Sequence, residues 1–211
     1  MSLSKQLWES NWDLALACQK HPFVQGIGAG TLSRSHFAFY VGQDAFFLEA
    51  FARAYSIAAA KAPDWEGFTS FHRLGDGVIE ELRLHAAYAK GWDVDLATVQ
   101  PAAATRHYTD FLLATAWSHS PGTIAIAMTP CLRLYAYLGQ ELAAQGIPDH
   151  DYRDWISTYS SERFEAQAQQ LEALVDRYAY APAQEITQSV YRYALLCEQA
   201  FFTAAWQERE G

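Results

Sequence analysis

Hydrophobic residues recur through the chain at helical intervals, and no stretch alternates apolar with polar residues as a half-buried strand does. Long segments rich in Ala, Leu, Gln and Glu, which favour helix, lie between glycines and prolines. Runs of β-branched residues are scarce. The pattern predicts helices over residues 3–20, 23–29, 34–60, 65–90, 105–118, 123–145, 150–158, from about 162 to 178, and from after Pro182 to 206.

Local signals place the helix boundaries in the first half of the chain. Pro22 ends the first helix, because the residue before a proline is pushed out of the α region. Ser33 is a candidate N-cap for the long third helix. Gly75 and Gly77 suggest a break or kink in the fourth helix, and Gly91 is a natural residue to follow its end. Residues 92–102 are expected to form a loop.

Proline and glycine interrupt the second half. Residues 120–122, Ser-Pro-Gly, are expected to form a turn, and residues 146–148, Gly-Ile-Pro, end the helix that follows it. Pro130 lies inside that helix, where it removes one backbone hydrogen bond and kinks the axis. We find no internal repeat, low-complexity segment or linker. The sequence therefore predicts an all-α protein of about nine helices in one domain spanning residues 1–211.

Composition narrows the class of protein. The 211 residues carry a net charge of −9, with 15 Lys plus Arg against 24 Asp plus Glu, which argues against a nucleic-acid partner. No apolar run is long enough to cross a membrane and no signal-peptide core opens the chain. The three cysteines, at positions 18, 131 and 197, lack metal-site or disulfide-framework spacing, so the reducing cytoplasm is expected.

Three buried-looking polar residues carry candidate chemistry. Cys131 directly follows the predicted kink, where it can face a cavity and act as a nucleophile; the alternative is an inert, buried thiol. Glu198 has apolar neighbours three and four residues away on both sides. Burial there would raise its pKa and suit proton transfer, whereas the alternative is a solvated stripe. Asp44 shares its helix face with Tyr40 and Phe47, so it is either a structural partner or a ligand-binding group.

Aromatic residues make up 15% of the chain, which fits either a large aromatic core or a pocket that stacks a flat ligand. Tyr108, Tyr135 and Tyr159 could line such a pocket and donate hydrogen bonds. Glu81 and His85, four residues apart, are the nearest approach to a metal-binding motif. No second motif of that kind occurs elsewhere, so we expect no metal site and no cofactor.

Several stretches together resemble the TenA/THI-4 family, also called thiaminase II, whose fold is a haem-oxygenase-like helical bundle. The resemblance covers nearly the whole chain and is carried by HPFVQGIG at 21–28, FYVGQD at 39–44, RHYTDFL at 106–112, MTPC at 128–131 with Tyr135, YRDWISTYSSE at 152–162, and Glu198 with Phe201.

The resemblance implies an enzyme of thiamin metabolism. Members with the cysteine convert 4-amino-5-aminomethyl-2-methylpyrimidine to the hydroxymethylpyrimidine, and many also cleave thiamin. Matching positions make Cys131 the nucleophile and Glu198 the general acid/base. They make Asp44 the group that holds the pyrimidine's amino group and a ring nitrogen. The other substrate-binding residues would be Tyr108, Tyr135, Tyr159, Phe47 and Phe201.

Some positions depart from the family pattern. Phe47 stands where many members have a tyrosine, Leu132 where a larger aromatic is common, and Phe202 where a tryptophan is usual. These changes bear on substrate preference. Two other functions stay open: a haem-oxygenase-like oxidase or di-iron enzyme, and a non-catalytic pyrimidine- or thiamin-binding or regulatory protein. Family members imply a homotetramer.

Overall fold

The computed structural model describes residues 1–179 and 184–207, and it is built from helices without strands in those residues. The all-α prediction is confirmed. Pro182, expected to precede the last helix, lies outside the described residues. The described helices are α1 (Leu3–Ser10), α2 (Trp12–Gln19), α3 (Pro22–Ala29), α4 (Arg34–Lys61), α5 (Trp65–Gly91), α6 (Ala103–Ser118), α7 (Pro121–Ala143), α8 (Arg153–Tyr159), α9 (Glu162–Tyr178) and α10 (Gln184–Gln207).

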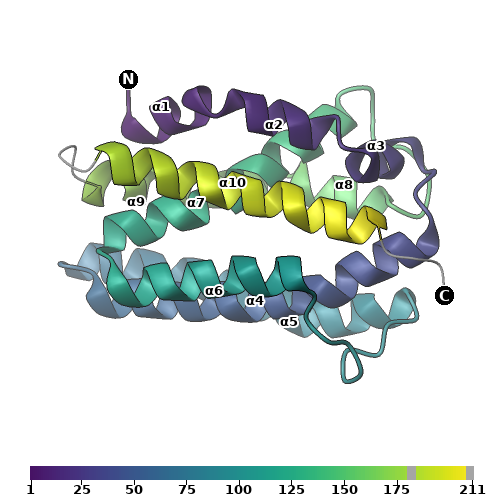
Figure 1. Ribbon diagram of the computed structural model, residues 1–211, viewed down its shortest axis with the longest axis horizontal. Coiled ribbons are helices and arrows are strands. Elements are labelled where there is room, and N and C mark those ends of the chain that lie inside the picture. The colour runs from purple at the N-terminus through teal and green to yellow at the C-terminus, as the bar shows by residue number, and fades with distance from the viewer. Residues whose placement is uncertain (180–183, 208–211) are drawn as a thin grey trace.

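The long helices form two layers (Figure 1). Helices α4, α5 and α6 lie side by side in one layer, and α7, α9 and α10 form the other. Helix α7 contacts both layers and also α8, so most of its side chains are buried. The short helices α1 to α3 cover the second layer on the side of α10. Residues brought to the seam between the layers therefore come from distant parts of the chain.

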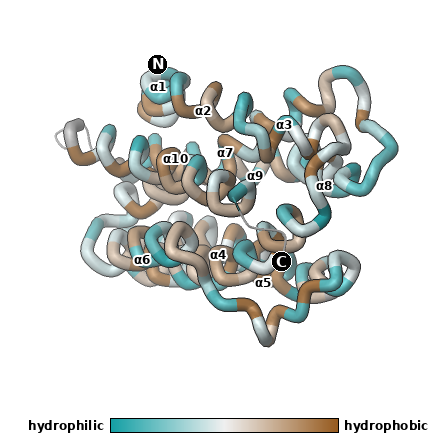
Figure 2. Tube along the Cα trace, turned by 45° about the vertical axis from the view of Figure 1, so that its right-hand side comes forward, coloured by the Kyte–Doolittle hydropathy of each residue, from teal (hydrophilic) through white to brown (hydrophobic). Residues whose placement is uncertain are grey.

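Local capping chemistry sets several helix boundaries, including the N-cap predicted at Ser33. The Ser33 side chain accepts a hydrogen bond from the His36 N–H at 3.3 Å and begins α4. The Ser161 side chain caps α9 in the same way, accepting from Phe164 N–H at 3.2 Å. Helix α3 begins with Pro22, as expected for a first-turn proline. Hydrophobic and hydrophilic segments alternate along the helices (Figure 2), so each helix has an apolar face to bury.

The predicted helix 3–20 is wrong: the chain forms α1 and α2, separated at Asn11. The buried Asn11 side chain donates to the Leu7 carbonyl at 2.8 Å and accepts from Arg192 of α10 at 3.2 Å. An asparagine held by these bonds competes with the helical backbone. A tertiary contact thus breaks the helix where the local pattern shows none.

Three further boundaries also differ from the prediction. Helix α5 runs without interruption through Gly75 and Gly77, and it includes Gly91, which has no positive φ. The left-handed residue after it is Asp93, with φ of 60°. Residues 120–122 begin α7 instead of forming a turn, because Ser120 is the N-cap and a proline fits the first turn.

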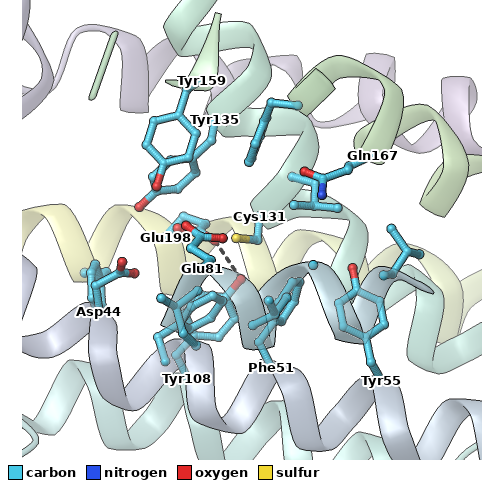
Figure 3. Close-up of a pocket in the computed structure, with 18 residues that line it drawn as sticks. Asp44, Phe51, Tyr55, Glu81, Tyr108, Cys131, Tyr135, Tyr159, Gln167 and Glu198 are labelled. Atoms are coloured by element: carbon cyan, nitrogen blue, oxygen red, sulfur yellow. Dashed lines mark hydrogen bonds between the residues drawn. The ribbon is translucent and has the colours of Figure 1, made fainter. Parts of the chain in front are cut away.

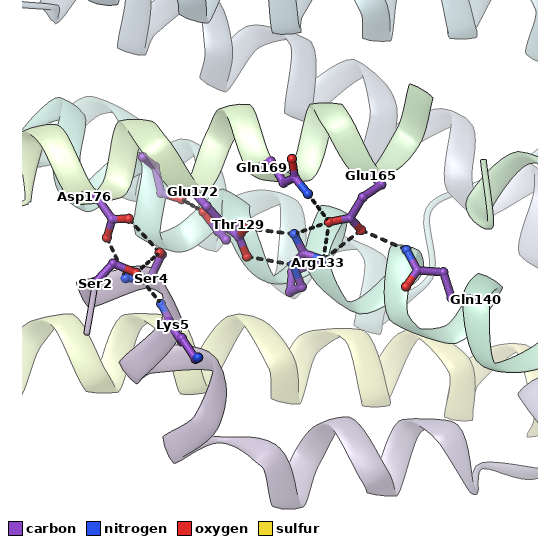
Figure 4. A network of polar contacts seen from close by, with 11 residues as sticks. Ser2, Ser4, Lys5, Thr129, Arg133, Gln140, Glu165, Gln169, Glu172 and Asp176 are labelled. Atoms are coloured by element: carbon purple, nitrogen blue, oxygen red, sulfur yellow. Dashed lines mark hydrogen bonds and ion pairs between the residues drawn. The ribbon is translucent and has the colours of Figure 1, made fainter. Parts of the chain in front are cut away.

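A part-buried ion network joins α7 to α9 (Figure 4). The Arg133 guanidinium lies 2.7 Å from Glu172 and 2.9 Å from Glu165, and Gln140 and Gln169 donate further hydrogen bonds to Glu165. Paired donors and acceptors of this kind fix geometry as well as charge. The network therefore fixes the register between α7 and α9. In the described part of the chain, no helix is both long and apolar enough to cross a membrane.

Candidate active site

The seam between the two layers encloses a small cavity, here called the chamber, of about 40 Å³. Its walls come from helices α4, α5, α6, α7, α9 and α10, and Tyr159 at the end of α8 completes them (Figure 3). All eight residues that the sequence singled out as catalytic or substrate-binding line it: Asp44, Phe47, Tyr108, Cys131, Tyr135, Tyr159, Glu198 and Phe201.

Cys131 and Glu198 are in direct contact in the chamber. Cys131 follows Pro130, which lies inside α7, and part of its surface faces the cavity. Glu198 comes from α10 and is 2% exposed, so the solvated alternative for this residue is excluded. The thiol of Cys131 forms a hydrogen bond with the Glu198 carboxyl group, and the Tyr108 hydroxyl donates to Glu198 Oε1 at 2.7 Å. The sulfur and the acid therefore share one side of the chamber.

Burial decides the protonation state of Glu198. Removal from water raises the pKa of this carboxyl group to about 8, although hydrogen bonds from Tyr108 and Cys131 oppose the shift. The nearby charge of Asp44 adds to it. At neutral pH the group therefore carries its proton, and it can donate that proton to a ligand.

The same surroundings keep Cys131 in its thiol form. Burial raises the pKa of Cys131 well above its ordinary value, and the acidic groups of Glu198, Asp44 and Glu81 raise it further. A thiolate is the nucleophilic form of cysteine. Cys131 therefore needs a proton acceptor, or a positive charge brought by a ligand, before it can react.

Asp44 lies on the chamber wall beside a histidine. It is 9% exposed, and burial raises its pKa to about 7. His85 Nε2 lies 2.8 Å from the Val41 carbonyl oxygen, which can only accept, so this nitrogen carries a proton. His85 Nδ1 then faces Asp44 at 3.9 Å. Asp44 therefore has the chamber on one side and a histidine nitrogen on the other.

Aromatic rings form the remaining walls. Phe47 packs against Tyr108 with ring centroids 4.8 Å apart and lies 6.4 Å from Phe201. Tyr135 and Tyr159 meet edge to face at 4.8 Å. Tyr159 reaches this position because α8 ends against Gly139 of α7, where a β-carbon would lie 2.6 Å from the Ser160 nitrogen. The aromatic residues therefore form part of both the hydrophobic core and the cavity wall.

A second and larger cavity adjoins the chamber, and we name it the vestibule. It measures about 390 Å³, and its walls are contributed mainly by α4, α5, α8 and the start of α9. Six residues line both cavities: Asp44, Gly77, Glu81, Tyr159, Phe164 and Gln167. These six residues are here called the neck. A ligand that enters the chamber from the vestibule must pass them.

The sequence reasoning missed three polar residues of the chamber, which are Glu81, Gln167 and Tyr55. The sequence singles out Glu81 only through its metal-motif spacing to His85. Its helix position, four residues after Gly77 and four before His85, was a usable signal, because a small residue leaves room for a cavity. Gln167 lies on a largely polar helix and has no such signal.

Glu81 and His85, the nearest approach to a metal-binding motif in the sequence, have other surroundings in the structure. Among residues 1–179 and 184–207, no three His, Cys, Asp or Glu side chains are grouped to hold a metal ion. Glu80 instead lies 3.5 Å from Arg163 in an exposed ion pair. His85 Nε2 is hydrogen-bonded to the Val41 carbonyl oxygen.

Comparison with known sequences gives consistent matches. Residues 9–208 match the model of the TENA/THI-4/PQQC family. An aminopyrimidine aminohydrolase of Halalkalibacterium halodurans is 32% identical over 220 residues, covering 99% of this chain and 97% of that protein. The mitochondrial bifunctional TH2 protein of Arabidopsis thaliana is 36% identical over 208 residues, covering 87% of this chain. The chain spans 34% of that relative's length and 28% of a ThiED multifunctional protein from Corynebacterium efficiens.

Comparison with solved structures supports the fold. A TenA homologue from P. horikoshii OT3 superposes with a TM-score of 0.91 at 24% identity, covering 98% of this chain and 99% of that one. Haem oxygenase-1 of Synechocystis sp. PCC6803 gives a TM-score of 0.64 at 17% identity, covering 97% and 92%. The predicted haem-oxygenase-like bundle is confirmed.

Proposed function

The chain belongs to the TENA/THI-4/PQQC family, and we propose that it is an aminopyrimidine aminohydrolase of thiamin salvage. Its substrate is 4-amino-5-aminomethyl-2-methylpyrimidine, which it converts to the 5-hydroxymethyl compound, and thiamin is a second substrate for the same chemistry. The observation that carries the proposal is the contact between a cysteine and a protonated glutamic acid in an enclosed aromatic chamber. The name of the relative from Halalkalibacterium halodurans supports it.

The chamber walls suit a flat, polar heteroaromatic ring. Phe47 and Phe201 offer ring faces and edges for stacking. Asp44 accepts a hydrogen bond from the 4-amino group and engages the adjacent ring nitrogen. The hydroxyl groups of Tyr135 and Tyr159 complete the polar contacts from the wall opposite α4. The departure at position 47 removes a hydroxyl from this set, so orientation relies on the remaining polar groups.

Glu198 and Cys131 act together on the ring. A pyrimidine becomes electrophilic when a ring nitrogen is protonated, and neutral Glu198 supplies that proton. The resulting carboxylate then takes the proton of the Cys131 thiol, with which it is already hydrogen-bonded. The sulfur adds to the adjacent ring carbon. In balance, one proton moves from sulfur to ring nitrogen through Glu198, and one carbon–sulfur bond forms.

The remaining steps exchange the substituent. The electron pair of the dearomatised ring then expels the exocyclic substituent: the carbon–nitrogen bond breaks, and the protonated amino group leaves as ammonia. Water adds to the methylene carbon and gives up a proton. The carbon–sulfur bond then breaks, the ring nitrogen returns its proton, and aromaticity is restored. Overall, the amine and one water give the alcohol and one ammonia.

The decisive experiment incubates the purified protein with the aminomethylpyrimidine and with thiamin, and it quantifies released ammonia and thiazole. Cys131→Ser is expected to abolish turnover while pyrimidine binding survives. Cys197→Ser is the matched control, because Cys197 is a free cysteine that does not line the chamber. Binding without turnover in the unmodified protein would instead identify a non-catalytic binding protein. Near-full activity of Cys131→Ser would remove this thiol from the mechanism.

We further propose a cytoplasmic homotetramer. Exposed aromatic side chains support burial between subunits, since Trp65 is 75% and Trp117 71% exposed in the isolated chain. The three cysteines are all free, which fits a reducing compartment. Light scattering of the purified protein measures the mass directly, and a monomeric mass would contradict the assembly.

A further inference from the structure

Glu81 is the one neck residue with a carboxyl group and no role in the chemistry above. It projects from α5 and lines both the chamber and the vestibule. Burial raises the pKa of Glu81 to about 7, and the charge of Asp44 adds to the shift. Glu81 in turn adds to the raised pKa that burial gives Cys131, so it lies near both groups. In the view of Figure 3 it lies between Asp44 and Cys131.

The neck concentrates acidic groups without a basic partner. Two carboxyl groups, Asp44 and Glu81, line it, and no Lys or Arg does. Arg163 lines only the vestibule, where it pairs with Glu80. Within the described residues, no hydrogen bond or ion pair joins the Glu81 carboxyl group to another side chain, although His85 and Arg163 act on it at longer range. An acidic group left without a close partner in a part-buried site is costly, and a positively charged ligand removes that cost.

The order of substituents on the pyrimidine ring indicates which protein side chain each substituent would face. If Asp44 holds the amino group on ring carbon 4 and Cys131 attacks carbon 6, carbon 5 and its exocyclic methylene lie between them. Glu81 lines the same chamber as Asp44 and Cys131 and acts electrostatically on both members of this pair. The methylene carries a primary amine, which is protonated at neutral pH. The leaving nitrogen therefore points toward the neck.

We propose that Glu81 binds the exocyclic ammonium group of the substrate and so selects the amine over its alcohol product. The inference rests on the proposed function, because it takes the position of the ring from Asp44 and Cys131. A carboxylate at this point accepts hydrogen bonds from the ammonium protons and holds the nitrogen on the vestibule side. After the carbon–nitrogen bond breaks, ammonia leaves through the neck. The neutral alcohol that remains loses this contact, which favours its release.

Binding measurements in a Cys131→Ser background test the proposal without relying on turnover. The probes are the aminomethylpyrimidine and the hydroxymethylpyrimidine, a matched pair that differs only in the exocyclic group. Glu81→Gln is expected to weaken amine binding by about 10- to 100-fold, the range for a lost charge-assisted hydrogen bond. Alcohol binding is expected to change less than about threefold. Glu80→Gln is the control, because it makes the same substitution one residue earlier, outside the neck.

The outcomes separate the two claims. If Glu81→Gln weakens both ligands equally, or neither, the role of Glu81 is refuted while the proposed function stands. If Glu80→Gln lowers amine affinity as much as Glu81→Gln, the effect is the general field of the vestibule and not a contact, which also refutes it. If the Cys131→Ser protein binds neither pyrimidine, the proposed function fails and the inference with it. Glu81→Asp, which keeps the charge, is expected to retain part of the preference for the amine, and it tests the charge independently of side-chain length.

Discussion

Replacement of Tyr108 by phenylalanine tests the proton relay through a change in pH dependence. Tyr108 is 1% exposed and donates to Glu198 Oε1 at 2.7 Å. This bond favours the ionised carboxylate and so holds the pKa of Glu198 below the value that burial alone would give. Its removal is expected to raise that pKa further and extend the acid form of Glu198 to higher pH.

The magnitude follows from the difference between two hydrogen-bond strengths. A hydroxyl bonded to a neutral carboxyl group contributes about 1 kcal/mol, and one bonded to a carboxylate about 2 kcal/mol. The difference of about 1 kcal/mol corresponds to roughly 0.7 of a pKa unit. The alkaline limb of kcat/KM, expected near the pKa of about 8 for Glu198, should therefore move upward by that amount. Loss of the neutral bond at pH 7 should lower Tm by about 2–4 °C.

The assay is ammonia release from the aminomethylpyrimidine between pH 6 and pH 10, in parallel with thermal unfolding. Tyr191→Phe is the matched control: Tyr191 is fully buried, its hydroxyl has no hydrogen-bond partner among the described residues, and it does not line the chamber. It should leave the alkaline limb in place and cause no loss of Tm. An alkaline limb that stays fixed or moves downward in Tyr108→Phe would refute the assignment of Glu198 as the acid.

Three other perturbations give distinct results. Because the pKa of Glu198 rises on folding from 4.5 to about 8, the folded state binds its proton more tightly than the unfolded state does. This stabilisation is complete below pH 4.5 and is lost as pH rises to 8. Tm at fixed ionic strength should therefore fall across that range, and a rising Tm would contradict the assignment. Arg133→Met leaves two part-buried glutamates unpaired and should cost about 3 kcal/mol of unfolding free energy in denaturant melts, with KM unchanged; a loss below about 1 kcal/mol would show that the network contributes little. Gly139→Ala pushes the end of α8 away from α7 and should raise KM for the amine, whereas Gly91→Ala, with open space around its new β-carbon, should not; equal KM values would contradict the packing argument.

The fold was predictable wherever a boundary depends on neighbours in the chain. The caps at Ser33 and Ser161 and the proline inside α7 are local signals, and the structure contains all three. The division at Asn11 was not predictable, because it depends on Arg192, which is 181 residues away. The role of Gly75 was not predictable either: its lack of a side chain suggested a break, but it lets α5 pack closely on α4, since an added β-carbon would lie 3.3 Å from the Tyr55 β-carbon.

The site residues also fall into two groups: those that the local sequence predicts and those that depend on packing between helices. Burial of Glu198 followed from its apolar neighbours on one helix, and the structure agrees. Its contact with Cys131 joins α7 to α10, and no pattern within either helix specifies it; the resemblance to a family supplied that pairing. Glu81 stands out in the sequence only for its spacing to His85. The packing of α5 against α4 and α9 places it at the neck, whereas Glu80 is exposed.

The raised pKa of Cys131 has a consequence for how the resting protein withstands chemical damage. Peroxides and alkylating reagents such as iodoacetamide attack thiolates far faster than thiols. With acidic groups around it and no cation within the chamber walls, the sulfur is held in its less reactive state. Under the proposed mechanism a protonated ring confers reactivity, so the ligand-free protein should outlast cysteine enzymes whose sulfur is permanently ionised when both are exposed to the same oxidant.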